Sequence, residues 1–373
     1  MYHSPLMIPT LAVIPSFVQQ WLVQQPQWVL LLIGAASLAA VIKGADLLVE
    51  GAAGIAKKFG MPEVVIGATI VSLGTTTPEM AVSVLAAFRG EAGLALGNGV
   101  GSIIADTGLI FALGCLMVRL PADRFILARQ GWVQFGVAAL LAVICYAKFA
   151  VEGNDATIRQ WTGLLFVALL VWYLWQSVRW AKQHPGPVVA EVEQDPHVAK
   201  AAGKSGLALI LIGVIGLAMV VFAGGVLIES IKELTLRWGV PEVVVAGTLV
   251  ALGTSLPELM VAIVSIRKGH PELLVGNVIG ADILNVLFVI GLSSLAAPLP
   301  IAKDYLPDGG ESVTYAFIGV HLPIMLAMLI LFRLFIFRSA KRGQFSKWMG
   351  LPLLVLYVAF IVLSFAIGGL GGH

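Results

Sequence analysis

Gly74-Thr75-Thr76-Thr77-Pro78-Glu79 is a polar segment inside a long apolar run, and the chain contains a second version of it. The second copy is Gly253-Thr254-Ser255-Leu256-Pro257-Glu258, so the two glutamates are 258 − 79 = 179 residues apart. The same offset carries Asp106 onto Asn285 with no gap between. A match of this length predicts a duplicated unit with one polar site built from both copies.

The composition places the chain in a lipid bilayer. Of its 373 residues, 59% are hydrophobic and 12% are charged, which is too little polar surface to cover a soluble globule of this size. Long apolar runs recur along the whole length, so we expect a polytopic helical protein with no nucleic-acid partner. Cys115 and Cys145 fall inside such runs and are interpreted as buried packing residues.

The apolar runs predict ten transmembrane helices. The first five lie at about 28–50, 62–88, 94–118, 131–149 and 161–180, and the second five at about 206–231, 241–266, 273–295, 313–337 and 351–367. We divide the chain into an N-terminal lead-in (1–27), a first five-helix repeat (28–180, motif at 60–110), a charged cytoplasmic linker (181–205) and a second repeat (206–373, motif at 239–290). The helices predicted at 131–149 and 161–180 carry no internal acid and are interpreted as scaffold.

An odd number of spans in each repeat has a topological consequence. The second repeat must enter the membrane upside down, so the predicted fold class is an all-α membrane protein of two inverted five-helix repeats. Sixteen Lys and Arg residues follow the odd-numbered helices, whereas six follow the even-numbered ones: Arg89, Lys148, Arg159, Lys232, Arg237 and Lys303. The positive-inside rule then predicts both termini on the extracytoplasmic side of the inner (plasma) membrane.

The repeated motifs place charge in the middle of the predicted spans. A carboxylate at the bilayer centre costs at least about 2.5 to 3.5 kcal/mol, so Glu79, Glu258 and Asp106 are expected to serve a function. Pro78 has no N–H to donate to the carbonyl of Gly74, so we expect the helix to open and leave backbone oxygens free. Hard oxygen ligands suit Ca²⁺ and Na⁺. The motifs lack His and Cys, which argues against zinc, copper or iron.

The predicted ion ligands are the carboxylates, amide and hydroxyls of both motifs, and no cofactor is predicted. They are Glu79, Glu258, Asp106, Asn285, Thr75, Thr76, Thr254, Ser255, Ser102 and Ser72. Glu50 and Glu229 are also related by the repeat but lie near helix ends, where a structural or an entrance role is open. Asp282 has no acidic counterpart, since Ile103 occupies that place in the first repeat; it is either a ligand or a group that supports the ligands.

At these residues the chain resembles the calcium/cation antiporter superfamily, and specifically the prokaryotic sodium/calcium exchangers. The two Gly-Thr-x-x-Pro-Glu segments resemble that family's paired repeats, and Gly97-Asn98-Gly99-Val100-Gly101-Ser102 resembles the second half of each repeat, as does its copy at residues 276–281. The resemblance implies ten helices, a Na⁺ gradient that drives Ca²⁺ export, and a site of two glutamates flanked by Thr, Ser, Asn and Asp.

Three positions depart from the family pattern. Asp106 and Asn285 stand where the relatives usually have Asn and Asp, so the acid and the amide are exchanged. Ala281 replaces a serine, which removes one Na⁺ ligand, and Thr76 and Thr77 replace a serine and an apolar residue. The exchange keeps the charge count and predicts Ca²⁺ binding, whereas Asn285 argues against K⁺ co-transport.

Other functions fit the same residues less well. A proton/calcium exchanger differs only in the ion that fills the carboxylates during the return step, and the hydroxyl-rich motif favours Na⁺. An intramembrane acid hydrolase needs no inverted, proline-opened cage, so we predict that the protein is not an enzyme. A passive channel does not need the inverted repeat, which favours alternating access. We expect a protein that functions as a monomer.

Overall fold

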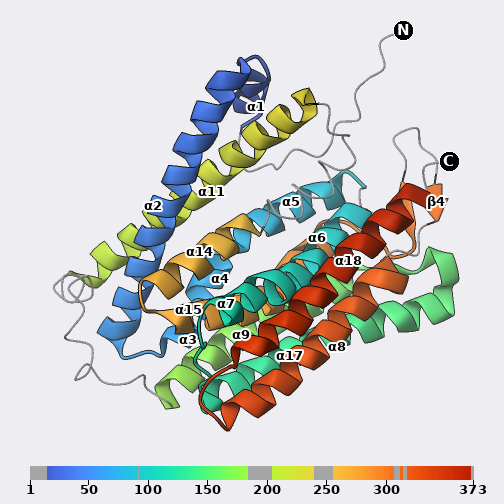
Figure 1. The fold of residues 1–373 in the computed structure, drawn as a ribbon. Coiled ribbons are helices and arrows are strands. Elements are labelled where there is room, and N and C mark those ends of the chain that lie inside the picture. Colours follow the sequence, from blue (N-terminus) through green and yellow to red (C-terminus); the bar gives the residue numbers. More distant parts are fainter. Residues whose placement is uncertain are drawn as a thin grey trace.

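The computed structural model describes residues 15–90, 92–183, 204–238, 255–305, 311–313 and 317–370. In these parts the chain is helical apart from four short strands, as the sequence predicts (Figure 1). Eight helices are long and apolar enough to cross a membrane, and a bent helix pair forms a ninth candidate span among the described residues. The first half of the predicted helix 241–266 lies outside the described residues.

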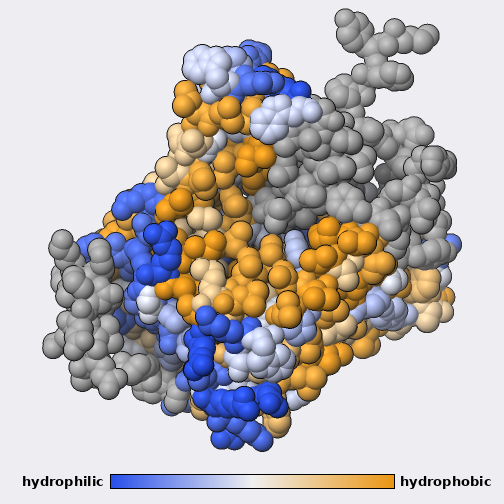
Figure 2. Space-filling view, in the orientation of Figure 1, coloured by the Kyte–Doolittle hydropathy of each residue, from blue (hydrophilic) through white to orange (hydrophobic). Residues whose placement is uncertain are grey.

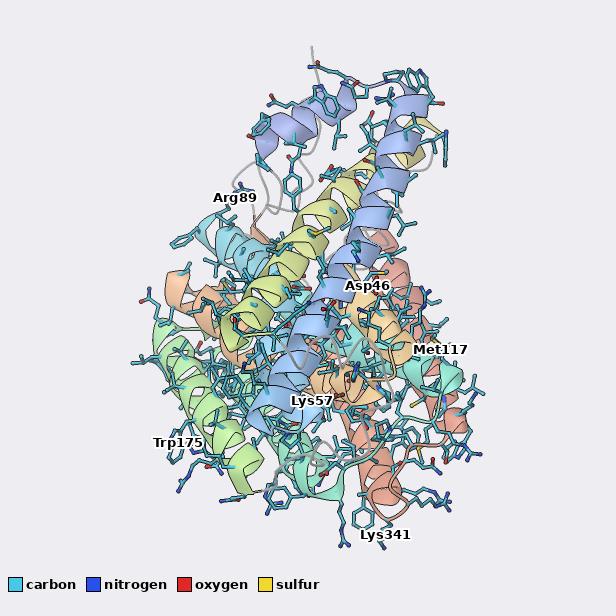
Figure 3. The ribbon with its side chains drawn as sticks, turned by 90° about the vertical axis from the view of Figure 1, so that its left-hand side faces the viewer. Asp46, Lys57, Arg89, Met117, Trp175 and Lys341 are labelled. Carbon is cyan, nitrogen blue, oxygen red and sulfur yellow. The ribbon has the colours of Figure 1, made fainter. Side chains whose placement is uncertain are left out.

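Two long helices, α2 (Gln27–Phe59) and α11 (Gly206–Arg237), lie side by side and project from the rest of the molecule (Figure 1). Glycines allow their backbones to touch: a Cβ on Gly44 would lie 2.8 Å from the carbonyl oxygen of Gly216. Figure 3 shows the same pair in front of the remaining helices. Both helices are longer than predicted, and α2 continues to Gly60, whose φ of 61° ends the helix.

The lead-in contains a short helix, α1 (Ser16–Val23), that packs against the outer ends of α2 and α11. Leu22 packs in a small apolar cluster with Leu30 and Leu234. The Arg237 guanidinium donates to the backbone carbonyl of Gln25 at 2.6 Å. The end of α1 is therefore joined to both long helices.

The first motif lies in a broken helix that runs through α3 (Glu63–Ile66), the π-helical η1 (Gly67–Val71), α4 (Ser72–Thr75) and α5 (Thr77–Phe88). The two halves are bent by 43° at Thr76. Pro78 occupies the first turn of α5, where its missing N–H costs no intrahelical hydrogen bond. The break thus follows from the proline that the motif carries.

Elements of the two repeats begin and end at positions that differ by 179 residues. After the first motif come α6 (Ala92–Ala105), the π-helical η2 (Asp106–Phe111) and α7 (Ala112–Met117). The second repeat has α14 (Leu256–Arg267), α15 (Pro271–Leu284), the π-helical η5 (Asn285–Ile290) and α16 (Gly291–Ala296). Both turns before α6 and α15 contain a glycine with φ of 79°, Gly90 and Gly269.

The remaining helices flank this centre. They and the short elements between them are α8 (Arg124–Glu152), the 3₁₀ turn η3 (Gly153–Asp155), β1 (Thr157–Ile158), α9 (Gln160–Gln183), β2 (Leu299–Pro300), β3 (Lys303–Tyr305), β4 (Glu311–Val313), the π-helical η6 (Phe317–His321), α17 (Leu322–Ala340), the 3₁₀ turn η7 (Lys347–Met349) and α18 (Gly350–Leu370). The predicted helix start at 313 is wrong. Val313 belongs to β4 because its backbone pairs with Lys303 in a hairpin, so the helix begins at Phe317.

Contacts between loops support the predicted sidedness of the helices. The turn after the seventh predicted helix meets the start of α3, which follows the loop after the first predicted helix, with His270 Nδ1 and Glu63 Oε1 2.8 Å apart. The loops after the third and ninth meet as well, because Phe345 N–H donates to the Leu120 carbonyl at 2.7 Å. β1 follows the fourth helix and pairs with β2, which follows the eighth. The four odd loops named here therefore share one end of the molecule, and the two even loops share the other.

Burial separates a central pair of spans from the surrounding ones. In the span of α15, η5 and α16, 94% of the most apolar 18 residues are buried, against 28% in α2. Large apolar side chains such as Trp132, Trp161 and Trp172 are exposed on outer helices, as expected for a surface that faces lipid. Figure 2 shows a broad apolar region on one face with hydrophilic residues gathered toward its ends. In the span of α6, η2 and α7 the corresponding share is 72%, so this span and its counterpart in the second repeat lie at the centre of a multi-pass membrane protein.

Candidate functional site

The break in the first motif positions Glu79 in the first turn of α5. Its side chain is 1% exposed, and Thr75 and Thr76 beside the break are fully buried. The carbonyl of Gly74 accepts a backbone N–H at the end of α4, so our expectation that the proline leaves it free is wrong. The chain turns at Thr76, so a backbone N–H at the end of α4 donates to the Gly74 carbonyl in place of the N–H that Pro78 lacks.

The second motif is described from Ser255 onward, and Thr254 lies outside the described residues. Glu258 occupies the first turn of α14, as Glu79 does in α5, and is 2% exposed. Its carboxyl group lies beside the hydroxyls of Thr75 and Thr76. A glutamate of the second repeat is therefore adjacent to the broken helix of the first, as the prediction of one shared site requires.

Asp106 and Asn285 each begin a π-helical turn, η2 and η5. Both are 1% exposed, and Asn285 Nδ2 donates to Asp106 Oδ2 at 3.5 Å. A π-helical turn widens the helix by one residue and is frequent at functional sites. The exchanged acid and amide are thus in direct contact.

Hydroxyl groups of the first motif link the broken helix to α15. Thr75 Oγ1 lies 3.3 Å from both the Ser72 carbonyl and Asn277 Oδ1. The hydroxyl of Ser72 donates to the Thr69 carbonyl at 3.3 Å, and Ser102 on α6 is 4% exposed. All described members of the predicted set are therefore buried, and Thr75 joins the first repeat to the second through Asn277.

Close packing at glycines allows this arrangement. A Cβ added to Gly280 would lie 2.5 Å from the Ala68 backbone and from Ser72 Oγ. A Cβ on Gly67 would lie 2.6 Å from the Leu273 carbonyl. The backbone of α15 consequently approaches η1 and α4 without a side chain between them.

The centre holds several buried oxygens that have no hydrogen-bond donor among the described residues. They are both carboxylate oxygens of Glu79, one each of Glu258 and Asp106, the hydroxyls of Thr76 and Ser255, and the amide oxygen of Asn285. In the described parts of the chain, none of these carboxylates forms an ion pair with Lys, Arg or His. An unpaired buried acceptor costs free energy, so this set fits a cation.

The donor set fits a hard ion held partly by neutral oxygens. Within the ranges that the structure describes, no three His, Cys, Asp or Glu side chains meet as a ready metal-binding group. A transported ion would therefore be coordinated by carboxylates together with hydroxyl, amide and carbonyl oxygens, which suits Na⁺ and Ca²⁺ better than transition metals.

Sequence reasoning missed the partners of Asp282. Its Oδ2 accepts from Gln134 Nε2 at 2.5 Å and from Thr107 Oγ1 at 2.6 Å. Gln134 belongs to α8, so the interpretation of this helix as scaffold is incomplete. The available signal was the pair of glutamines at 130 and 134, which share one face of an otherwise apolar helix and are both buried.

The two glutamates near helix ends form ion pairs away from the centre. Glu50 Oε1 lies 2.7 Å from Lys204 Nζ, and Glu229 Oε2 lies 3.6 Å from Lys232 Nζ. Of the two roles that the sequence left open, these contacts favour the structural one.

Comparison with known proteins matches both halves of the chain. The family model described as sodium/calcium exchanger protein matches residues 29–179 and 208–366. The sodium/calcium exchanger MaX1 of Methanosarcina acetivorans is 29% identical over 91% of this chain and 99% of its own length. The inner membrane protein YrbG of Escherichia coli is 30% identical over 74% of this chain and 83% of its own length.

Solved structures show the same architecture. The structure of the sodium/calcium exchanger from Methanococcus jannaschii superposes with a TM-score of 0.70 at 25% identity, covering 89% of this chain and 98% of that chain. A structure of the exchanger NCX_Mj soaked with Na⁺ and Sr²⁺ also has a TM-score of 0.70 at 25% identity, covering 90% and 99%. The match extends over nearly the whole of each chain and includes both repeats.

Proposed function

Because the chain belongs to the sodium/calcium exchanger protein family, we propose that it exchanges Na⁺ for Ca²⁺ across the membrane by alternating access. It is a transporter, not an enzyme. In the proposed reaction, Ca²⁺ and Na⁺ occupy one buried site at different times, and the energy stored in the Na⁺ gradient moves Ca²⁺ against its own gradient.

The observation that carries this proposal is the set of unpartnered oxygens at the centre of the bundle. The oxygens come from both repeats and are shielded from solvent, since Glu79, Glu258 and Asp106 are at most 2% exposed. Burial without a counter-charge makes the empty site costly, and an arriving cation removes that cost. We therefore assign the two glutamates as the anionic ligands of Ca²⁺.

Neutral ligands complete the proposed site. Thr75, Thr76 and Ser255 contribute hydroxyls, and Asn285 contributes its amide oxygen. We retain Thr254, Ser72 and Ser102 as further candidates. Asp106 adds a third negative charge. Several Na⁺ ions in the site that Ca²⁺ has left need more compensating negative charge than a single Ca²⁺ ion needs.

The helix arrangement supports alternating access. Inverted repeats give the inward-open and outward-open states related structures, so a site at the repeat interface can be exposed to either side in turn. The α2 and α11 pair packs as a separate layer against the motif helices (Figures 1 and 3). We propose that this pair moves relative to the other helices, while the site residues remain on the broken and π-helical spans.

The charged loops support a proposed orientation. Figure 3 shows Lys57 and Lys341 toward one end of the molecule and Arg89 toward the other. Since the odd loops carry most of the positive charge, we place them in the cytoplasm and both termini outside the inner membrane.

Ion flux in proteoliposomes tests the proposed exchange. Vesicles loaded with Na⁺ and diluted into Na⁺-free medium should take up radioactive Ca²⁺, and vesicles with equal Na⁺ on both sides should not. A protonophore should leave this uptake intact. Uptake that follows an imposed pH gradient and ignores Na⁺ would identify a proton/calcium exchanger, and uptake without any counter-ion gradient would identify a channel.

A further inference from the structure

Asp282 is a buried acid that the proposed Ca²⁺ site does not use. It lies on α15 and is 1% exposed. Two short hydrogen bonds, from Gln134 Nε2 at 2.5 Å and Thr107 Oγ1 at 2.6 Å, both end on its Oδ2. An amide N–H and a hydroxyl that donate to one oxygen stabilise the ionised carboxylate, because an ionised carboxylate only accepts hydrogen bonds.

The second carboxylate oxygen of Asp282, Oδ1, accepts no hydrogen bond from the described residues. Oδ1 is buried and has no hydrogen-bond partner, and no Lys, Arg or His of the described residues forms an ion pair with this side chain. A buried carboxylate with one bare oxygen and no counter-charge is expensive in a low-dielectric interior. A cation bound at Oδ1 would offset this cost.

Two neighbouring side chains offer oxygens of the same kind. Asn285 follows Asp282 by three residues, so both lie on one face of the helix, and the Asp106 carboxyl is close enough for its charge to act on Asp282. The amide N–H₂ of Asn285 is used by Asp106 Oδ2, which leaves Asn285 Oδ1 and Asp106 Oδ1 unpartnered. Three unpartnered oxygens thus belong to three adjacent residues.

We propose that Oδ1 of Asp282 is a cation ligand and forms, with Oδ1 of Asp106 and Oδ1 of Asn285, a Na⁺ subsite beside the Glu79 and Glu258 pair. This inference rests on the proposed Na⁺/Ca²⁺ exchange and names where one of the Na⁺ ions binds. Glu79 and Glu258 balance one Ca²⁺, whereas Asp106 and Asp282 add negative charge that monovalent ions can fill.

A purely structural role for Asp282 makes a different prediction. In that case the side chain only ties α8 and η2 to α15, and Asp282→Asn would preserve it, because the amide oxygen still accepts from Thr107 and Gln134. As a Na⁺ ligand, the same variant loses the charge on which binding depends. The conservative substitution therefore separates the two roles.

The experiment compares wild type, Asp282→Asn and Thr107→Val in three measurements. Glu229→Gln is the matched control, because it removes a largely buried carboxylate that pairs with Lys232 on α11. The measurements are equilibrium binding of radioactive Na⁺ to the purified protein in Ca²⁺-free buffer, binding of Ca²⁺ without Na⁺, and the Na⁺ concentration that gives half-maximal exchange. Thermal unfolding establishes that each variant is folded.

We expect Asp282→Asn to bind about one Na⁺ fewer per chain and to need about tenfold more Na⁺ for exchange, the usual size of a lost charged interaction. Ca²⁺ binding and the Glu229→Gln control should match wild type. Thr107→Val keeps the Asp282 carboxylate but removes the hydroxyl that donates to it, so the Na⁺ requirement should rise less than in Asp282→Asn. If Asp282→Asn does not fold, Thr107→Val still tests the subsite.

Several results would overturn the subsite. Unchanged Na⁺ binding in both Asp282→Asn and Thr107→Val would leave Asp282 a structural residue. A loss of Ca²⁺ binding as large as the loss of Na⁺ binding would place Asp282 in the Ca²⁺ site instead. If wild type itself shows no Na⁺-dependent Ca²⁺ flux, the proposed exchange fails, and this result is visible before any variant is compared.

Discussion

Asn285 donates from Nδ2 to Oδ2 of Asp106 over 3.5 Å, so two residues that the 179-residue repeat relates also touch each other at the centre of the bundle. Each begins a π-helical turn in its own repeat. The pair therefore lies at the contact between equivalent positions of the two repeats. Asp106 carries a carboxyl group there, and Asn285 carries a neutral amide.

This contact predicts that the charge can come from either repeat. Asp106→Asn should reduce Na⁺-driven Ca²⁺ flux about tenfold or more, because a charged ligand is lost from a buried site. Adding Asn285→Asp should restore a substantial part of the flux, since the acid returns to an adjacent position. Flux in proteoliposomes under a fixed Na⁺ gradient measures both. A double variant as inactive as the single one would show that the two positions are not equivalent.

The two glutamates should be required for transport but not for folding. Glu79→Gln and Glu258→Gln each remove one negative charge from a Ca²⁺ site that we assign to both, so each should abolish Ca²⁺ uptake. Removal of an unpaired buried charge should leave thermal stability equal or higher. Glu152→Gln, in an ion pair with Lys148 at a helix end, is the matched control and should transport normally. Normal uptake by either motif variant would remove that glutamate from the site.

The packing of α15 against the broken helix should tolerate no side chain at Gly276. A Cβ there would collide with the Val64 carbonyl, so Gly276→Ala should destabilise the protein by about 1–3 kcal/mol. Thermal unfolding in detergent measures this effect. Gly136→Ala on α8 is the control, since a Cβ at that position meets nothing within 4 Å. Equal melting temperatures for the two variants would contradict the close packing.

Membrane sidedness can be tested with single cysteines. Cys115 and Cys145 are fully buried, so the wild-type protein should react little with a membrane-impermeant maleimide. Applied to spheroplasts, the reagent should label Arg89→Cys and Arg159→Cys, which lie in even loops. It should label Lys341→Cys only after the membrane is permeabilised. Labelling of Lys341→Cys in sealed spheroplasts would reverse the proposed orientation, and equal labelling of all three would contradict the inverted repeats.

Local sequence signals predicted most of the helical framework. Apolar length, the glycine turns at Gly90 and Gly269 and the prolines of the motifs are encoded over a few residues, so the spans and the break at Thr76 followed from them. The gapless offset of 179 residues also placed Asp106 and Asn285 in equivalent positions, and the structure gives both the same π-helical turn.

Features that depend on distant contacts were not predictable in this way. The partners of Asp282 come from positions 148 and 175 residues away, and no local pattern pairs them. The start of η6 at Phe317 depends on the hairpin of β3 and β4, which removes Val313 from the apolar run. The hydrogen bond that satisfies Gly74 depends on the tight turn at Thr76, which a proline rule alone does not specify.

Competition between the two ions for the purified protein tests the central claim most directly. We expect radioactive Ca²⁺ to bind wild type in detergent, to be displaced cooperatively by Na⁺ but not by equal K⁺, and to be lost in Glu79→Gln. This result would mean that both ions use the buried oxygens shared by the repeats. Ca²⁺ binding that is indifferent to Na⁺, or that survives intact in Glu79→Gln, would contradict the account.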